Sequence, residues 1–188
     1  QFLKENLITG GVKSCMFDIL LGCERRHRNY VYNYIHNNNL IDQVIMTYHR
    51  TWNQDLRLSN EFIMEEQGLE FLEAPGHTIH SVRYHGHVMW LSQVIPLQIY
   101  NQTHYTLVTE TNAVNEFNFY TEKIWKPVIA GRLFVVIAGQ YFLRNLQAMG
   151  FRTYHDIIDE SYDLEPNNEL RWQQALEIGR AHVWTPVT

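Results

Sequence analysis

Short apolar runs recur along the chain, separated by amphipathic stretches. Three runs rich in branched and aromatic residues have the length of buried strands: 16–21 (MFDILL), 43–48 (QVIMTY) and 133–138 (LFVVIA). The stretch 104–109 (HYTLVT) alternates polar and apolar positions, which is typical of a strand. These four segments are predicted to form the sheet, with a further short strand at 151–154.

Apolar residues at helical spacing predict helices between the strands. The predicted helices are 28–37, 88–100, 121–131, 141–149 and 168–176. Pro96 interrupts the second of them, and Thr121 is a suitable N-cap for the third. Strands that alternate with helices of this length predict an α/β protein, with a Rossmann-like parallel sheet and helices on both faces. Ligands of such sheets bind beyond the carboxyl ends of the strands, which here are the loops 22–28, 109–121 and 139–140.

The composition describes a globular chain with enough apolar residues for one hydrophobic core or for two small ones. Of 188 residues, 45% are hydrophobic and 13% aromatic, which excludes a disordered chain. No apolar run approaches the roughly 18–20 residues of a membrane span. The net charge of −5 argues against bulk nucleic-acid binding but allows a local basic pocket. Two cysteines, Cys15 and Cys23, are expected to be free thiols in a reducing, cytoplasmic compartment.

Both ends of the sequence suggest a fragment. The chain has no initiator Met and no signal-peptide pattern, and 178–188 (IGRAHVWTPVT) resembles the translation of a sequencing adapter. We therefore expect a natural α/β domain over 1–177 and a non-native tail over 178–188, the alternative being a genuine polar tail.

Common nucleotide and hydrolase motifs are absent, but a basic cluster follows the first strand. The sequence has no P-loop, GxGxxG, GxSxG or CxxC. The cluster 24–28 (ERRHR) lies at the carboxyl end of the first strand and opens a helix. Guanidinium groups at that position can hold a phosphate with help from the helix N-terminus. The alternative is a solvated loop with surface charges.

A second candidate is 120–123 (YTEK), which also opens a helix after a strand. Lys123 in the first turn opposes the helix dipole, and a phosphate partner would explain it. A capping motif with an exposed lysine is the alternative. Glu110 directly follows strand 104–109, where a carboxylate can accept from a pair of sugar or ribose hydroxyls. The alternatives for Glu110 are a surface acid or an ion pair with Lys123.

Two further clusters are weaker candidates. Four histidines have a spacing that could suit a metal: His77, His80, His85 and His87. We favour a mobile loop over the active cleft and expect no metal there. Five acids near the C-terminus could supply an acid and a base: Asp156, Asp159, Glu160, Asp163 and Glu165. A capped, solvated loop is the favoured interpretation.

The stretch 105–139 (YTLVTETNAVNEFNFYTEKIWKPVIAGRLFVVIAG) resembles the C-terminal half of the α-1,3-fucosyltransferase family. Glu110 falls on the Glu of that family's Phe-Glu-Asn segment, and 121–123 reproduces its Thr-Glu-Lys. The stretch 17–35 (FDILLGCERRHRNYVYNYI) is similar to the family's early strand, loop and helix, with Arg28 on the phosphate-binding Arg. The chain departs from the pattern at Thr111, where the family has Asn, and at Phe119, where it has Tyr.

The resemblance implies the donor-binding half of a GT-B glycosyltransferase, which transfers a fucose-like sugar from a nucleotide sugar, commonly a GDP-sugar, to a glycan or lipid-linked acceptor. Arg28 and Lys123 would neutralise the diphosphate leaving group, and Glu122 would bind ribose or sugar hydroxyls. The donor-site residues that it implies are Arg28, Glu110, Tyr120, Thr121, Glu122 and Lys123, with Arg25 and His27 as weaker candidates.

The same resemblance implies no metal or other cofactor and a general base in a separate N-terminal domain, so that this fragment alone would be inactive. The protein would be cytoplasmic or peripheral to a membrane. Two other functions stay open: a non-catalytic α/β module that binds an anionic ligand or glycan, and a metal-dependent hydrolase that uses the four histidines.

Overall fold

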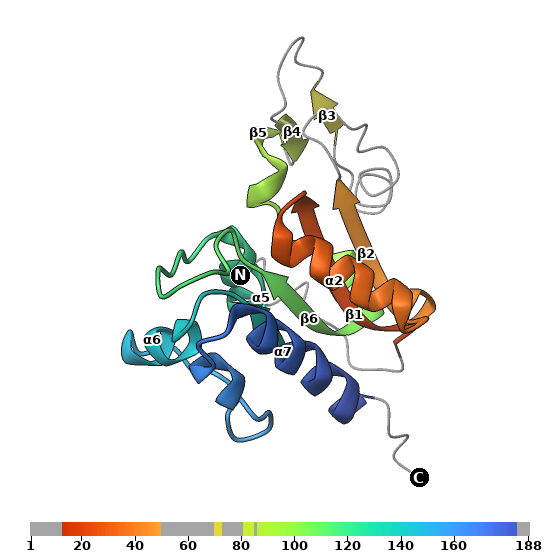
Figure 1. The fold of residues 1–188 in the computed structure, drawn as a ribbon. Coiled ribbons are helices and arrows are strands. Elements are labelled where there is room, and N and C mark those ends of the chain that lie inside the picture. Colours follow the sequence, from red (N-terminus) through yellow and green to blue (C-terminus); the bar gives the residue numbers. More distant parts are fainter. Residues whose placement is uncertain (1–12, 50–69, 73–80, 85, 184–188) are drawn as a thin grey trace.

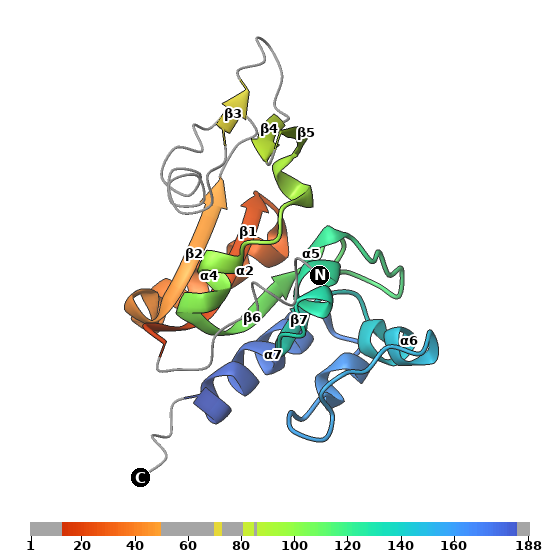
Figure 2. The same cartoon turned by 180° about the vertical axis from the view of Figure 1, so that it is seen from behind.

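The computed structural model describes residues 13–49, 70–72, 81–84 and 86–183. Its main sheet is parallel, with the strand order β2-β1-β6-β7 (Figures 1 and 2). These strands are β1 (Cys15–Cys23), β2 (Val44–His49), β6 (Thr103–Thr109) and β7 (Phe134–Ile137). A small antiparallel sheet consists of β3 (Glu70–Leu72), β4 (Ser81–Tyr84) and β5 (His87–Trp90).

Helices cover both faces of the main sheet. α2 (Arg26–Asn37) and α7 (Asn168–Val183) lie on one face, and α4 (Leu97–Gln102) and α5 (Glu122–Ile129) lie on the other (Figures 1 and 2). α6 (Phe142–Ala148) follows β7 and contacts the short 3-10 helix η3 (Ser161–Leu164). Two further 3-10 turns are η1 (Ile41–Gln43) and η2 (Leu91–Gln93). The α/β fold with a Rossmann-like parallel sheet is therefore confirmed.

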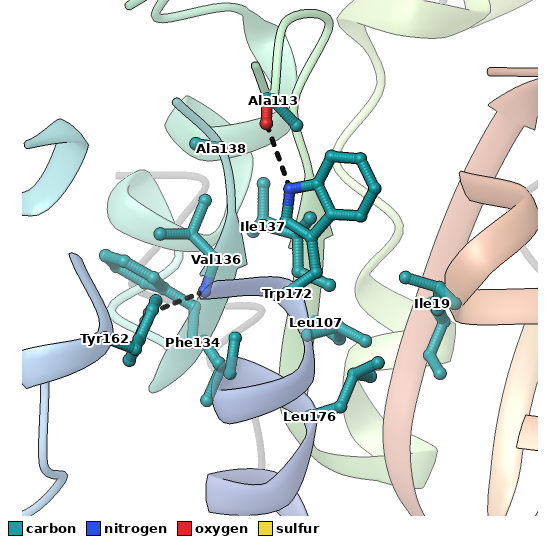
Figure 3. Close-up of a cluster of buried hydrophobic side chains, with 14 of the residues drawn as sticks. Ile19, Leu107, Ala113, Phe134, Val136, Ile137, Ala138, Tyr162, Trp172 and Leu176 are labelled. Atoms are coloured by element: carbon teal, nitrogen blue, oxygen red, sulfur yellow. Dashed lines mark hydrogen bonds between the residues drawn. The ribbon is translucent and has the colours of Figure 1, made fainter. Parts of the chain in front are cut away.

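One part of the hydrophobic core lies between α7 and the sheet (Figure 3). Trp172 and Leu176 of α7 are buried against the strands that contain Ile19 and Leu107. The Trp172 indole N–H donates to the carbonyl oxygen of Ala113 (2.9 Å), so its polar atom is satisfied inside the core. Burial of each such large apolar side chain stabilises the fold by about 1.5–3 kcal/mol.

The four predicted strands of the main sheet and most predicted helices are confirmed. The four strands of the main sheet occupy the predicted segments to within two residues at each end. α2 begins at Arg26, two residues before the predicted start. α5 has Thr121 as its N-cap, whose hydroxyl accepts from the backbone N–H of Lys123 (3.3 Å).

The predictions for two segments were wrong. The first half of the predicted helix 88–100 belongs to β5 and η2, and α4 begins only after Pro96. Proline removes a backbone donor and disfavours helical backbone in the residue before it, so the helix starts behind it. The predicted strand 151–154 is irregular. The Glu160 carboxylate binds this segment through Tyr154 N (2.7 Å) and Thr153 Oγ1 (2.6 Å), in place of a neighbouring strand.

The C-terminal helix is longer than predicted. α7 continues past residue 176 to Val183 and therefore runs into 178–188, the segment predicted to be a non-native tail. The division at residue 177 stays a prediction. None of the helices in the described part of the chain has both the length and the apolar character needed to span a bilayer.

Candidate functional site

The strand order of the main sheet reverses between β1 and β6. From β1 the chain passes through α2 to β2 on one side, whereas β6 lies on the other side of β1. In open parallel sheets, ligands bind at such a point, beyond the carboxyl ends of the strands. Here this place is bordered by the start of α2, which follows β1, and by Glu110, which follows β6.

The start of α2 is cationic and lacks a capping side chain. Arg25 is the N-cap residue, yet its side chain makes no capping hydrogen bond, and the first turn contains no acid. Arg26 and Arg28 lie in that turn, and Arg26 pairs with Glu169 of α7 (2.6 Å) at the surface. The free N–H groups of a helix start are partly positive, so cations there are unfavourable unless an anion joins them. The arrangement is typical of an anion-binding helix start.

Arg28 is buried, with 4% of its surface exposed. Its Nη1 donates to the carbonyl oxygen of Cys23 (2.8 Å), and its Nε is buried without a hydrogen-bond partner. Within the described part of the chain, no carboxylate forms an ion pair with it. Burial, with a further contribution from Arg25, lowers the pKa of Arg28 to about 10. A buried guanidinium without a counter-charge costs several kcal/mol, and an anionic ligand would offset that cost.

Gly22, at the end of β1, lies beside this guanidinium. Its φ of +68° is in the left-handed region, and a Cβ added there would lie 3.5 Å from Nη1 of Arg28. A side chain at position 22 would therefore combine backbone strain with contact against the cation. The turn that ends β1 thus brings backbone close to Arg28.

His27 is buried beside the same strand end. Its Nε2 lies 2.8 Å from the carbonyl oxygen of Glu110, and because a carbonyl only accepts, Nε2 bears the proton. The ring also contacts Trp172, with ring centroids 5.9 Å apart. Burial, together with the charge of Arg28, lowers the pKa of His27 to about 4. At neutral pH His27 is therefore an uncharged donor that joins α2 to the end of β6.

Glu110 is fully buried, and its carboxylate occupies the start of α5. Oε1 accepts from the backbone N–H groups of Thr121 (3.2 Å) and Ile124 (3.3 Å). Oε2 accepts from Thr111 N (3.0 Å) and from the Thr121 hydroxyl (2.7 Å). Glu110 is thus neither a surface acid nor the ion-pair partner of Lys123, which were the alternatives from the sequence. Its oxygens, predicted to accept from sugar hydroxyls, are engaged by the protein itself.

Lys123 pairs with its neighbour Glu122. The ammonium lies 2.6 Å from Glu122 Oε1 and within 3.5 Å of the hydroxyls of Thr121 and Thr111. Burial alone would raise the pKa of Glu122, but the hydrogen bond and charge of Lys123 hold that pKa below its ordinary value. Glu122 is consequently ionised at neutral pH, and with 40% of its side chain exposed it can accept hydrogen bonds from a ligand.

Tyr120 faces away from these groups. Its hydroxyl donates to the carbonyl oxygen of Phe142 (3.2 Å), and the two rings lie 4.6 Å apart between centroids. Tyr120 therefore packs on α6 and belongs to the edge of the core. Of the predicted donor-site residues, it is the one that the structure places elsewhere.

The remaining predicted residues gather at the reversal point. The charges of Glu110 and Glu122 both act on the pKa of Arg28, and Glu122 is paired with Lys123. Arg25 acts on both Arg28 and His27. The starts of α2 and α5, which are nearly a hundred residues apart in the sequence, therefore form one electrostatic unit.

Lys126 is a member of this unit that the sequence analysis missed. Burial lowers its pKa to about 8, while Glu122 opposes that shift and Lys123 adds to it. Its spacing in the sequence could have identified it. Residues three and four apart share a helix face, which places Lys126 beside Lys123 and Glu122.

In the described part of the chain, neither of the two weaker clusters forms a group that could hold a metal ion. His77, His80 and His85 lie outside the described residues, and His87 is exposed on β5. Within the described residues no group of three or more His, Cys, Asp or Glu side chains could hold a metal ion. Of the C-terminal acids, Glu160 binds the segment that precedes it, and Asp163 accepts from the backbone N–H groups of Leu143 and Arg144 at the start of α6.

Comparison with protein-family models, with curated proteins and with solved structures gives no match. The resemblance drawn from 17–35 and 105–139 therefore rests on those residues alone.

Proposed function

We propose that this chain is the donor-binding half of a GT-B glycosyltransferase, resembling the α-1,3-fucosyltransferases, and that it holds the diphosphate of a nucleotide sugar at the start of α2. The observation that supports this most strongly is Arg28: a buried guanidinium with an unpartnered Nε, on an uncapped helix start, at the reversal point of a parallel sheet. These features favour a bound anion with more than one charge.

In the proposed reaction, the bond between the sugar and the diphosphate breaks, and negative charge develops on the departing phosphate oxygen. Arg28 and the N–H groups at the start of α2 stabilise that charge, which is electrostatic catalysis by groups already in place. Lys123 adds a second cation from α5, and the ionised Glu122 accepts from hydroxyls of the ribose or sugar. The general base for the acceptor hydroxyl is expected from an N-terminal domain. The donor is a GDP-sugar in this proposal, and the acceptor is a glycan or lipid-linked sugar.

The test is calorimetric titration of the protein with inorganic pyrophosphate, GDP and UDP. In Arg28→Met, the affinity for each is expected to fall by about 10- to 100-fold, the range for a lost charge-assisted hydrogen bond. Because the variant also removes a buried unpaired charge, its Tm is not expected to fall.

The matched control is Arg152→Met. Arg152 is an exposed arginine that pairs loosely with Asp156 (3.8 Å), so its loss is expected to leave all three affinities unchanged. The proposal fails if the unaltered protein binds none of the three ligands, or if Arg28→Met binds pyrophosphate as tightly as the unaltered protein.

A second candidate is a non-catalytic module that binds anions, and the burial of Glu110 favours it, because one predicted sugar-binding carboxylate is engaged internally. The two functions differ in what they recognise. A donor site binds a GDP-sugar more tightly than pyrophosphate, since Glu122 contributes to hydroxyl binding. Equal affinity for the two ligands, unaltered in Glu122→Gln, would support the module.

A further inference from the structure

We propose that Glu110 is a positioning residue of the anion site: it holds the starts of α2 and α5 at one separation, and with them Arg28 and Lys123, without touching the ligand. This inference rests on the proposed function, because it assumes that both cations act on one anion. It differs from the role that the sequence suggested for Glu110, which was direct contact with hydroxyls.

The side chain of Glu110 holds the start of α5. Two oxygens accept four hydrogen bonds, three of them from backbone N–H groups, at Thr111, Thr121 and Ile124. A carboxylate at a helix N-terminus interacts favourably with the helix dipole as well. The first turn of α5, including Lys123, is therefore fixed relative to the end of β6.

The backbone of Glu110 holds the start of α2. Its carbonyl oxygen accepts from Nε2 of His27, the second residue of α2 (2.8 Å), and its N–H donates to Ile137 of β7 (3.0 Å). Glu110 thus bonds α2, α5 and β7 through three different groups. Since Arg28 directly follows His27, the positions of both cations, Arg28 and Lys123, depend on hydrogen bonds to Glu110.

Two observations indicate that Glu110 does not touch the ligand. Its residue surface is 0% exposed, and each carboxylate oxygen already has two donors. Its negative charge lies at the start of α5, so that helix start is already occupied by an anion of the protein. The first turn of α2 contains no acid, and its N-cap side chain makes no capping hydrogen bond, which leaves this helix start to accept the ligand.

The first test is a double-mutant cycle between Glu110→Gln and Lys123→Ala, with inorganic pyrophosphate as the ligand. Glutamine keeps the shape of the side chain, but its amide NH2 is a donor where a carboxylate oxygen of Glu110 accepts hydrogen bonds. Glu110→Gln is expected to weaken pyrophosphate binding roughly tenfold, as for one lost charge-assisted hydrogen bond. In the Lys123→Ala background the same change is expected to weaken binding less than twofold, because the cation that Glu110 positions is already absent. Equal losses in both backgrounds would overturn the proposal.

Asp163→Asn is the matched control. Asp163 is also buried and binds the start of another helix, through Leu143 N (2.9 Å) and Arg144 N (3.0 Å) on α6. Both variants are expected to lower the Tm, but only Glu110→Gln is expected to weaken pyrophosphate binding. A variant of Glu110 that loses stability and keeps its affinity would reduce the residue to a structural role.

A second measurement needs no ligand, and it separates this inference from the proposed function. Hydrogen exchange at the backbone amides of 121–124 is expected to accelerate in Glu110→Gln, and exchange at 143–144 in Asp163→Asn. If the unaltered protein binds no pyrophosphate or nucleotide, the proposed function fails, although accelerated exchange would still show that Glu110 holds α5. Unchanged exchange at 121–124 would overturn the positioning role whatever the protein binds.

Discussion

Asp18 and Arg132 form an ion pair inside the protein, on the face of the sheet that α4 covers. Their side chains are 0% and 2% exposed, and Oδ1 of Asp18 lies 2.8 Å from Nη2 of Arg132. Thr103 and Thr106 also donate to Oδ1, whereas Oδ2 is buried without a partner. Burial, opposed by the charge of Arg132, raises the pKa of Asp18 to about 6. Arg132 further donates to the carbonyl oxygen of Tyr100 (2.6 Å), so the pair joins β1, α4 and the segment before β7.

Removal of Arg132 alone is expected to be strongly destabilising. Arg132→Met would leave the Asp18 carboxylate buried without a counter-charge, at a cost of about 3–5 kcal/mol in the free energy of unfolding. The double variant Asp18→Asn/Arg132→Met removes both charges and is expected to recover at least half of that loss. Urea denaturation of the three proteins at pH 7.5 measures this. A double variant less stable than Arg132→Met would contradict the argument.

Comparison of Arg132 with Arg28 shows what single residues in the sequence could not reveal. Both arginines are buried, but among the residues that the structure describes only Arg132 has a carboxylate partner, which lies 114 positions away in the sequence. Arg28 could be identified as a functional candidate from the sequence, because it follows a predicted strand. Arg132 could not be identified as a structural residue from the sequence, because its pairing with Asp18 depends on β6 lying between β1 and β7.

At the scale of elements, the loop between β6 and α5 is held against the end of β7 by hydrogen bonds and by one glycine. Gln140 N donates to the carbonyl oxygen of Asn115 (2.8 Å), and Asn118 Nδ2 donates to Gln140 O (3.1 Å). Gly139 lies directly beneath this loop. A Cβ at position 139 would be 2.7 Å from Asn115 O and 2.9 Å from Asn118 Oδ1. The loop that leads into α5 therefore requires glycine at this position for close approach.

Gly139→Ala is accordingly expected to push the loop away from β7. The contact with a backbone oxygen cannot be relieved by rotation of a side chain, so we expect a loss of about 1–3 kcal/mol in the free energy of unfolding, as for overpacked sites. Gly131→Ala is a useful contrast. That position has φ +64° and nothing within 4 Å of an added Cβ, so only backbone strain opposes it. A Tm for Gly139→Ala equal to that of the unaltered protein would refute the close-approach argument.

The observed boundaries of helices and strands agree with the predicted ones where residues adjacent in the sequence decide them. Thr121 caps α5 as predicted, since a hydroxyl at the N-cap needs only the backbone two residues ahead. The segment 151–154 has the composition of a strand, yet Glu160 accepts from Tyr154 N and from the Thr153 hydroxyl, and no strand in the described part of the chain pairs with the segment. A strand requires a partner, so this prediction depended on information that lies outside the segment itself.

At the scale of the whole molecule, His27 connects three elements: it lies in α2, its ring contacts Trp172 of α7, and it bonds to the backbone at the end of β6. It does so as a neutral side chain, because burial and the charge of Arg28 lower its pKa to about 4, from an ordinary value of 6.5. The stability of the fold therefore depends on pH through this residue.

The sign of that dependence follows from proton binding. Below about pH 6.5 the unfolded chain takes up a proton at His27, which the folded protein does not bind until about pH 4. The contribution of His27 to stability is complete above pH 6.5 and is lost between these two values, by roughly 3 kcal/mol in total. The variant His27→Gln can still donate to Glu110 O but does not titrate.

Urea denaturation of both proteins at pH 7 and pH 4 tests this expectation. The unaltered protein is expected to lose roughly 3 kcal/mol more than His27→Gln between the two values, because the comparison removes the effects of all other groups, Asp18 included. Parallel losses in the two proteins would mean that His27 titrates alike in the folded and unfolded chain.

The sequence by itself determined the α/β class, the strands of the main sheet and the cationic start of α2, because periodicity, capping and the placement of charge after a strand are local properties. Only the tertiary structure decided which buried charges are satisfied. Asp18 pairs with Arg132, Glu110 accepts hydrogen bonds from the start of α5, and Arg28 forms no ion pair with a carboxylate of the described residues. The physical reason is that a buried charge is satisfied by whatever the strand order brings beside it, and those partners are distant in the sequence.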